Sequence, residues 1–167
     1  KETSGVMIIA KKETAHHQLV EQFSKRKVTK IYTALVGGRM KQESGLFSGP
    51  IARHPKIRVK MAVQTSGKRA LTHWKLKRYF TDKASLVECD LKTGRTHQIR
   101  VHFANEGHPL LGDYTYGYNP NKYRFKKADR IMLHASEITF FHPSSGKVMY
   151  FSSPLPPCMK LFLEELR

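Results

Sequence analysis

Two strand-like runs separated by a short turn constrain the fold of this chain most strongly. Residues 69–80 and 84–91 are rich in aromatic and β-branched side chains, and the Thr-Asp-Lys triplet between them is typical of a turn. Strands that are joined by so short a connection pair antiparallel. The segments 130–141 and 148–151 repeat this arrangement around a Pro-Ser-Ser-Gly turn. The sequence therefore predicts a sheet that is mainly antiparallel.

Further strands are expected nearer the start of the chain. Residues 5–10 (GVMIIA) form a short apolar run that is typical of a buried strand. Residues 30–36 (KIYTALV) alternate like a strand and end at a Gly-Gly pair. Residues 44–68, which are rich in Gly, Pro, Ser and basic side chains, predict either a long hairpin or a loop with weak strands. The polar, aromatic and basic stretch 114–129 is expected to be a loop or an insertion.

Helices are expected beside this sheet. One runs from a capping Thr14 to Lys25, because apolar side chains recur there at helical spacing. A short helix follows the turn at Gly94 and stops before Gly107, and a last helix covers residues 158–166 behind a Pro-rich segment. The sequence thus predicts an α+β fold with a mixed, mainly antiparallel sheet and flanking helices.

The charge balance of the chain is strongly basic. Thirty Lys and Arg residues face 13 Asp and Glu residues, which gives a formal net charge of +17 over 167 residues. Such an excess implies a polyanionic partner, most simply nucleic acid. A membrane surface is the rival partner, but the sequence contains no apolar run of spanning length and no long basic amphipathic helix. Nucleic-acid binding without membrane attachment is therefore expected.

Neither disulfide nor metal chemistry is expected. The two cysteines, Cys89 and Cys158, lie far apart without a CxxC pattern, which favours a reduced compartment. The nine histidines include the pair His16-His17, but no helical i, i+4 pair with carboxylates that would hold zinc or iron. No secretory leader is visible, so the expected location is the cytoplasm, or an organelle if a transit segment precedes the chain.

The segment 92–113 (KTGRTHQIRVHFANEGHPLLGD) concentrates polar and charged side chains around the short helix. Ile99 and Phe103 are four residues apart and can share an apolar face, from which Arg100 points away. An arginine is rarely buried without an anionic partner. On its own the segment is most simply a solvated basic helix that contacts phosphates. Asp113, at its end, is expected to cap or brace a turn.

The same segment, through its GRTHQIRVH and GHPLLGD runs, resembles the signature of the RluA-type pseudouridine synthases. Residues 3–5 (TSG) are similar to the end of the family motif in which an aspartate and two variable residues precede Thr-Ser-Gly. Residues 27–36 (KVTKIYTALV) look like the segment that carries the family's active-site tyrosine. Residues 51–73, together with the HPSSGK and SPLP runs, are similar to the RluD-like branch, so the resemblance spans essentially the whole chain.

The resemblance implies that residues 1–167 form a pseudouridine synthase catalytic domain without its N-terminal part. The family's catalytic aspartate is expected immediately before Lys1. Tyr32 takes the position of the active-site tyrosine, which would stack on the flipped base and shuttle the C5 proton. Arg100 takes the position of the arginine that keeps the aspartate ionised and oriented. No metal and no organic cofactor is implied.

Several side chains are expected to contact RNA. They are Arg26, Lys27, Lys30, Arg53, Arg58, Arg95, His97 and Gln98. Basic clusters of this kind are often only solvated faces, but a net charge of +17 makes phosphate contact at least as plausible an interpretation. For Arg95, His97 and Gln98 the alternative is that they hold the Gly turn and the start of the short helix.

The expected reaction is the isomerisation of specific uridines to pseudouridine in structured RNA. The RluD-like features favour large-subunit ribosomal RNA as the substrate, with tRNA second, and a monomer is expected. A non-catalytic RNA-binding module of the same fold is the alternative. If the polypeptide begins at Lys1, it is expected to bind RNA without isomerising it.

Overall fold

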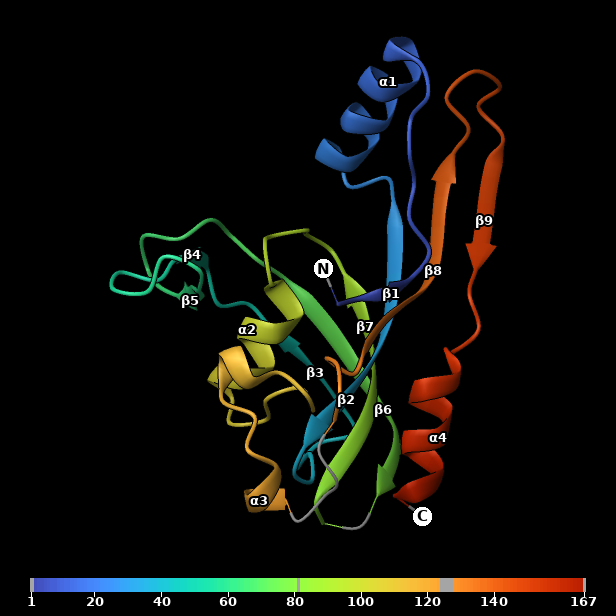
Figure 1. The fold of residues 1–167 in the computed structure, drawn as a ribbon. Helices are drawn as coiled ribbons and strands as arrows, with labels where there is room; N and C mark the ends of the chain where they lie inside the picture. The colour runs from blue at the N-terminus through green and yellow to red at the C-terminus, as the bar shows by residue number, and fades with distance from the viewer. Residues whose placement is uncertain (1, 81, 124–127, 167) are drawn as a thin grey trace.

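The computed structural model describes residues 2–80, 82–123 and 128–166, and one seven-stranded sheet runs through the molecule (Figure 1). Its strands are β1 (Ser4–Gly5), β2 (Thr29–Gly37), β3 (Ser44–Phe47), β6 (Thr72–Phe80), β7 (Ala84–Leu91), β8 (Leu133–Phe141) and β9 (Val148–Ser152). A separate small hairpin consists of β4 (Ile51–Arg53) and β5 (Met61–Val63). The helices are α1 (Glu13–Ser24), α2 (Gln98–Asn105), the 3-10 helix η1 (Tyr114–Tyr116), α3 (Pro120–Tyr123) and α4 (Pro157–Glu165).

The strand order is β1-β8-β2-β7-β6-β3, and β9 also pairs with β8. Every pair in this sheet is antiparallel except β1 with β8. The predicted α+β fold with a mixed, mainly antiparallel sheet is therefore confirmed. The hairpins predicted at 69–80 with 84–91 and at 130–141 with 148–151 are confirmed as β6–β7 and β8–β9, although Thr81 of the first turn lies outside the described residues.

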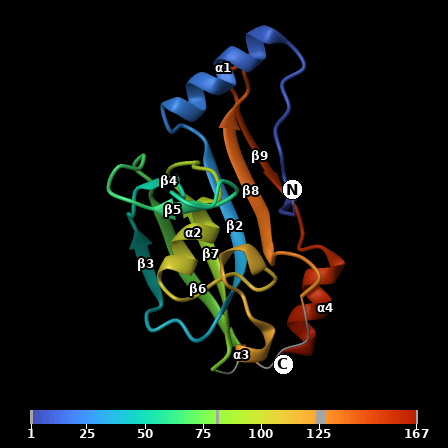
Figure 2. The same cartoon turned by 60° about the vertical axis from the view of Figure 1, so that its left-hand side comes forward.

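The alternation of β2 divides the core between two faces of the sheet. Ala34 and Val36 are fully buried in a cluster that also contains Ile99 and Phe103 of α2. Leu35 is fully buried in a second cluster, which α4 completes. Figure 1 shows α2 and α4 on opposite sides of the sheet, and Figure 2 shows α2 in front of it. Since side chains alternate along a strand, Tyr32 shares the α2 side with Ala34, and it packs against that cluster.

A β-bulge interrupts the pairing of β2 with β8 next to Tyr32. Ile31 pairs with Glu137 and Tyr32 pairs with Ala135, so Ser136 is an extra residue in β8. The hydroxyl of Ser136 hydrogen-bonds to that of Thr33 at 2.7 Å. The pairing of β2 with β7 continues without a shift through the same residues. Bulges of this kind commonly re-aim a side chain beside a functional site.

The prediction of a buried strand at residues 5–10 is wrong. Only Ser4 and Gly5 pair with β8, because β9 occupies the same edge of β8 from Glu137 onward. The residues beyond Gly5 are extended, and their side chains alternate between the core and solvent. Met7 and Ile9 are 79% and 73% exposed. Only every second side chain of this apolar run therefore packs against the core.

The predicted cap of the first helix is also wrong. Lys12 is the extended residue before α1, so Thr14 lies inside the first turn, and Lys12 makes no side-chain capping bond. The helix ends at Ser24, one residue before the predicted end. Leu19 is buried, whereas Phe23 is 42% exposed.

The two segments without a clear strand pattern contain more structure than expected. Within 44–68, β3 joins the main sheet beside β6, and β4–β5 forms a separate arm, residues 50–68, which we call the β4–β5 arm. The predicted loop at 114–129 contains η1 and α3, and Tyr118 and Tyr123 are buried against the α4 side of the core. Residues 124–127 lie outside the described residues. The last predicted helix is confirmed as α4. Within the described residues, no helix has both the length and the apolar character to span a bilayer.

Candidate active site

The turn before α2 is held by a buried network around Gln98. The Gln98 side-chain oxygen accepts hydrogen bonds from the Thr93 hydroxyl at 2.7 Å and from the Arg95 backbone N–H at 3.0 Å. Its amide nitrogen donates to the Leu71 carbonyl and to the Thr72 hydroxyl, both at 2.9 Å. Gln98 is only 3% exposed. Its amide is engaged inside the protein, which favours the second of its two expected roles, holding the turn before α2.

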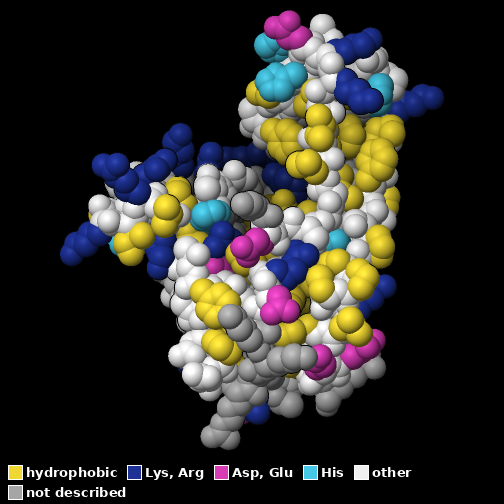
Figure 3. Space-filling model, viewed as in Figure 1, with side chains coloured by type: hydrophobic (Ala, Val, Ile, Leu, Met, Phe, Trp, Pro, Cys, Tyr) yellow, Lys and Arg dark blue, Asp and Glu magenta, His cyan; other side chains and the backbone are white. Residues whose placement is uncertain are grey.

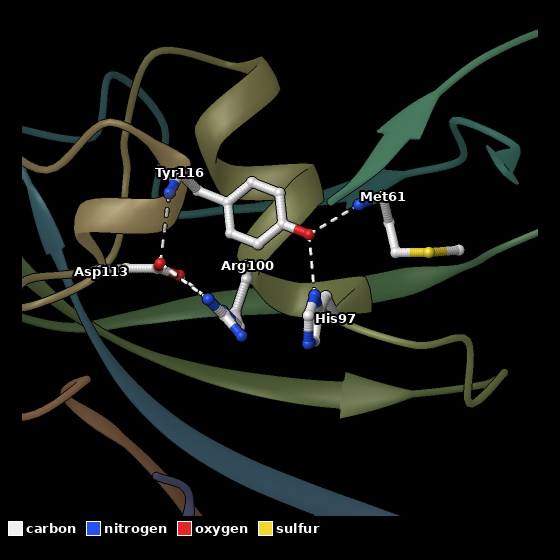
Figure 4. Close-up of polar contacts among 5 residues, drawn as sticks. All are labelled: Met61, His97, Arg100, Asp113 and Tyr116. Carbon is white, nitrogen blue, oxygen red and sulfur yellow. Dashed lines mark hydrogen bonds and ion pairs between the residues drawn. The ribbon is translucent and has the colours of Figure 1, made fainter. Parts of the chain in front are cut away.

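Arg100 forms a two-pronged ion pair with Asp113 (Figure 4). Nε donates to Oδ2 at 2.6 Å and Nη2 donates to Oδ1 at 2.8 Å. The Asp113 side chain is fully buried and that of Arg100 is 14% exposed. Burial opposes the charged form of Arg100, but the hydrogen bonds to Asp113 and its negative charge raise the pKa of the guanidinium overall. Arg100 is therefore a fixed cation.

Asp113 also caps η1, as its predicted structural role requires. Its Oδ1 accepts a hydrogen bond from the backbone N–H of Tyr116 at 3.2 Å. The sequence did not indicate that this same carboxylate is the anionic partner of Arg100. Residues 114–129 were expected to be a loop, so Tyr116 was missed as well. The spacing of Asp113, Tyr116 and Gly117 does indicate this turn. An aspartate that caps a short helical turn, followed four residues later by a glycine that ends it, is a typical pattern.

Tyr32 and Arg100, the two predicted catalytic residues, line one cavity of about 220 Å³. Glu2, Thr3 and His97 line it as well, together with apolar side chains of β7, α2 and β8. The cavity thus brings together residues that are far apart in the sequence. Burial raises the pKa of Tyr32, so its phenol is protonated at neutral pH. The site can offer a stacking ring with a proton-carrying hydroxyl, and an oriented positive charge.

Two further cavities adjoin this one. One, of about 270 Å³, is lined by Arg26, Lys30 and Arg95, and the other, of about 430 Å³, by Arg53 and Arg95. Arg95 lines all three cavities, so they meet at the turn before α2. Burial lowers the pKa of Lys30, an effect that the charge of Asp90 opposes and that of Lys92 reinforces.

Four of the residues predicted to bind RNA, Arg26, Lys30, Arg53 and Arg95, line these cavities, and two more, Lys27 and Arg58, are close to them in sequence. Arg53 and Arg58 belong to the β4–β5 arm, and Figure 3 shows Lys and Arg side chains gathered over that arm. Lys27 and Arg58 are exposed. We use the term basic surface for Arg26, Lys27, Lys30, Arg53, Arg58 and Arg95.

A metal-binding group is not found among residues 2–80, 82–123 and 128–166. No three His, Cys, Asp or Glu side chains in these ranges lie together as ligands would. The buried His102 serves the core instead, because its ring bonds to the Thr72 hydroxyl at 2.9 Å and to the Gly49 carbonyl at 2.8 Å.

Comparison with known proteins shows which family the chain belongs to. A family model described as RNA pseudouridylate synthase matches residues 1–105. An uncharacterized RNA pseudouridine synthase of Aquifex aeolicus is 47% identical over 165 residues, which are 96% of this chain and 52% of that protein. The ribosomal large subunit pseudouridine synthase D of Escherichia coli is 39% identical over 176 residues, which cover 100% of this chain and 53% of that protein.

A solved structure shows the same similarity in three dimensions. Human RNA Pseudouridylate Synthase Domain Containing 1 superposes with a TM-score of 0.79 at 30% identity, covering 95% of this chain and 68% of that one. The chain spans about half the length of the curated relatives it matches. Sequence and fold agree, and the chain belongs to the RNA pseudouridylate synthase family.

Proposed function

We propose that this chain contributes the active site of a pseudouridine synthase that isomerises uridine in large-subunit ribosomal RNA. The observation that carries the proposal is the common cavity of Tyr32 and Arg100. In the reaction the N1–C1′ bond of uridine breaks, the base turns over, and C5 bonds to C1′. The proton on C5 is then lost to solvent while N1 takes one up. The target base must leave its stack to enter the cavity.

Arg100 has one nitrogen left for a second carboxylate. Nε and Nη2 bind Asp113, whereas Nη1 makes no hydrogen bond to any residue that the structure describes. We assign Nη1 to the catalytic aspartate, which the family motif places immediately before Lys1. Glu2 and Thr3 support this assignment because they line the cavity, and the charge of Glu2 contributes to the raised pKa of Arg100. Asp113 would then anchor Arg100, and the aspartate would act on the nucleotide.

Tyr32 is suited to receive the flipped base. Its ring lies on the α2 side of β2 and lines the same cavity as Arg100, and a neutral phenol can both stack on a base and exchange a proton. The basic surface supports an RNA substrate, since Arg26, Lys30, Arg53 and Arg95 line the cavities that adjoin the site. The name of the Escherichia coli relative, ribosomal large subunit pseudouridine synthase D, favours ribosomal RNA over other RNA classes.

The test is tritium release from RNA that carries 5-tritiated uridine, with the full-length protein as the enzyme. We expect release from large-subunit ribosomal RNA transcripts and little or none from tRNA transcripts. Tight RNA binding without tritium release would support a binding-only module and overturn the proposed activity. Preferential release from tRNA would overturn the proposed substrate. Turnover by the 167-residue chain alone would overturn the placement of the aspartate.

A further inference from the structure

Tyr116 contacts two of the polar side chains that α2 and the turn before it contribute to the cavity, His97 and Arg100 (Figure 4). Its ring lies against the guanidinium of Arg100, 4.7 Å from the ring centroid. Its hydroxyl lies 2.8 Å from Nδ1 of His97, and the two rings meet edge to face. Its backbone N–H bonds to the same Asp113 oxygen that accepts from Nη2 of Arg100.

The Tyr116 hydroxyl accepts one hydrogen bond from the backbone and can donate its own proton to His97. The backbone N–H of Met61 in β5 donates to the hydroxyl oxygen at 2.8 Å, so the hydroxyl proton is available for Nδ1 of His97. Burial and the charge of Arg100 lower the pKa of His97, although Asp113 opposes them. His97 is therefore neutral at pH 7. A neutral imidazole that accepts at Nδ1 carries its proton on Nε2.

The backbone of His97 supports a functional interpretation of this arrangement. Its φ of 57° lies in the left-handed region, which residues other than glycine rarely adopt. Such a conformation persists only where the surroundings impose it, and it is concentrated at functional sites. His97 is held there at the start of α2, in the cavity shared with Tyr32.

We propose that Tyr116 is a positioning residue, which fixes the guanidinium of Arg100 and locks His97 as a donor to an oxygen of the RNA. The donor is the Nε2–H of His97, and the acceptor is a carbonyl or phosphate oxygen of the nucleotide in the cavity. Because Met61 belongs to β5, the same hydroxyl ties this geometry to the β4–β5 arm. The identity of the acceptor rests on the proposed function, whereas the tautomer of His97 does not.

The tautomer is tested by nitrogen NMR of the histidine rings in the full-length protein. We expect His97 of the wild type to be protonated at Nε2 only, and Tyr116→Phe to give a mixture of both tautomers. Tyr150→Phe, which changes an exposed tyrosine of β9, is the matched control and should leave the His97 signals unchanged. A wild-type His97 protonated at Nδ1, or signals that Tyr116→Phe does not alter, would overturn the proposal.

Steady-state kinetics test the consequence for turnover. Tyr116→Phe keeps the ring against Arg100, so kcat should fall about tenfold with KM changed by less than about threefold. Tyr116→Leu also removes the ring while the backbone bond to Asp113 is kept, and kcat should fall about 100-fold. Near-normal kcat in Tyr116→Leu would overturn the positioning role. If the wild type itself shows no turnover, the proposed function fails, and the NMR result alone decides on Tyr116.

Discussion

The surroundings of Arg100 and the basic surface beside them are built in different ways. Arg100 is fixed by a fully buried carboxylate and by an aromatic ring, with short and directed contacts. Lys27 and Arg58 of the basic surface extend from exposed positions into solvent. A reaction needs groups whose positions are fixed, whereas attraction of a polyanion needs only charge near its path. We therefore expect substitutions in the two regions to separate turnover from affinity.

The largest effect is expected at Arg100. Arg100→Lys keeps the positive charge but loses the two-pronged geometry, so turnover should fall by about 10³-fold or more while RNA affinity changes less than about threefold. Arg100→Ala should abolish turnover, but it leaves Asp113 buried without its partner, at a cost of about 3–5 kcal/mol. The double variant Arg100→Ala with Asp113→Asn is the control for this loss of stability. Tritium release measures turnover and filter binding measures RNA affinity. A large loss of affinity in Arg100→Lys would show that the two regions do not separate turnover from affinity.

Tyr32 should give the next largest effect. Tyr32→Ala removes both the ring and the hydroxyl and should abolish measurable turnover. Tyr32→Phe keeps the stacking ring, so it isolates the hydroxyl, and we expect a loss of about 10²–10⁴-fold if the phenol transfers the C5 proton. Both variants should bind RNA nearly as the wild type does. Turnover of Tyr32→Phe within about twofold of the wild type would limit Tyr32 to stacking.

Smaller effects, on affinity alone, are expected from the basic surface. Lys30→Gln and Arg95→Gln should each weaken RNA binding and reduce the slope of log affinity against log salt by about 1. Lys147→Gln, at an exposed position next to β9, is the matched control and should leave the slope unchanged. The measurement is a salt titration of binding at constant pH. If these variants reduced kcat as strongly as Arg100→Lys, the two regions would not be functionally distinct.

His102 should make the stability of the core depend on pH. Burial lowers its pKa, although the hydrogen bond to Gly49 and the charge of Glu106 oppose the shift. As pH falls below the ordinary value of about 6.5, the unfolded chain takes up a proton before the folded protein does, so stability decreases, by at most about 1.4 kcal/mol per pH unit. Urea unfolding between pH 7 and pH 5 measures this dependence. His102→Gln should show a shallower decrease, and an identical decrease would assign the effect to other groups.

The smallest effect is expected in the difference in folding stability between two variants of His97. His97→Ala keeps a Cβ at a left-handed φ, whereas His97→Gly removes it, so the glycine variant should be more stable than the alanine variant by about 1 kcal/mol. Both lose the ring that faces the cavity and should lose turnover. Thermal unfolding of the two variants gives the difference. Equal stabilities would mean that the turn relaxes without strain.

The sequence predicted the parts of this molecule that depend on local pattern. Strands β6 and β7 alternate clearly and are joined by a short turn, and Ile99 and Phe103 share the buried side of α2 as their spacing indicated. The prediction of a strand at residues 5–10 is wrong because β9 occupies the edge of β8 along which that strand would pair. No local sequence pattern reveals this. The pairing of Arg100 with Asp113 was missed for a similar reason, since it depends on how the chain turns back through η1.

The bulge beside Tyr32 sets the local twist of the sheet rather than its register. Without Ser136, Ile31 would still face Glu137 and Tyr32 would still face Ala135, so the ladder between β2 and β8 would become regular. The buried His134, which hydrogen-bonds to Ser4 at 2.8 Å, would keep Thr33 as its partner in β2. The extra twist and the hydrogen bond between Ser136 and Thr33 would be lost. Deletion of this one residue should therefore leave the strand order intact and change the direction in which Tyr32 enters the cavity.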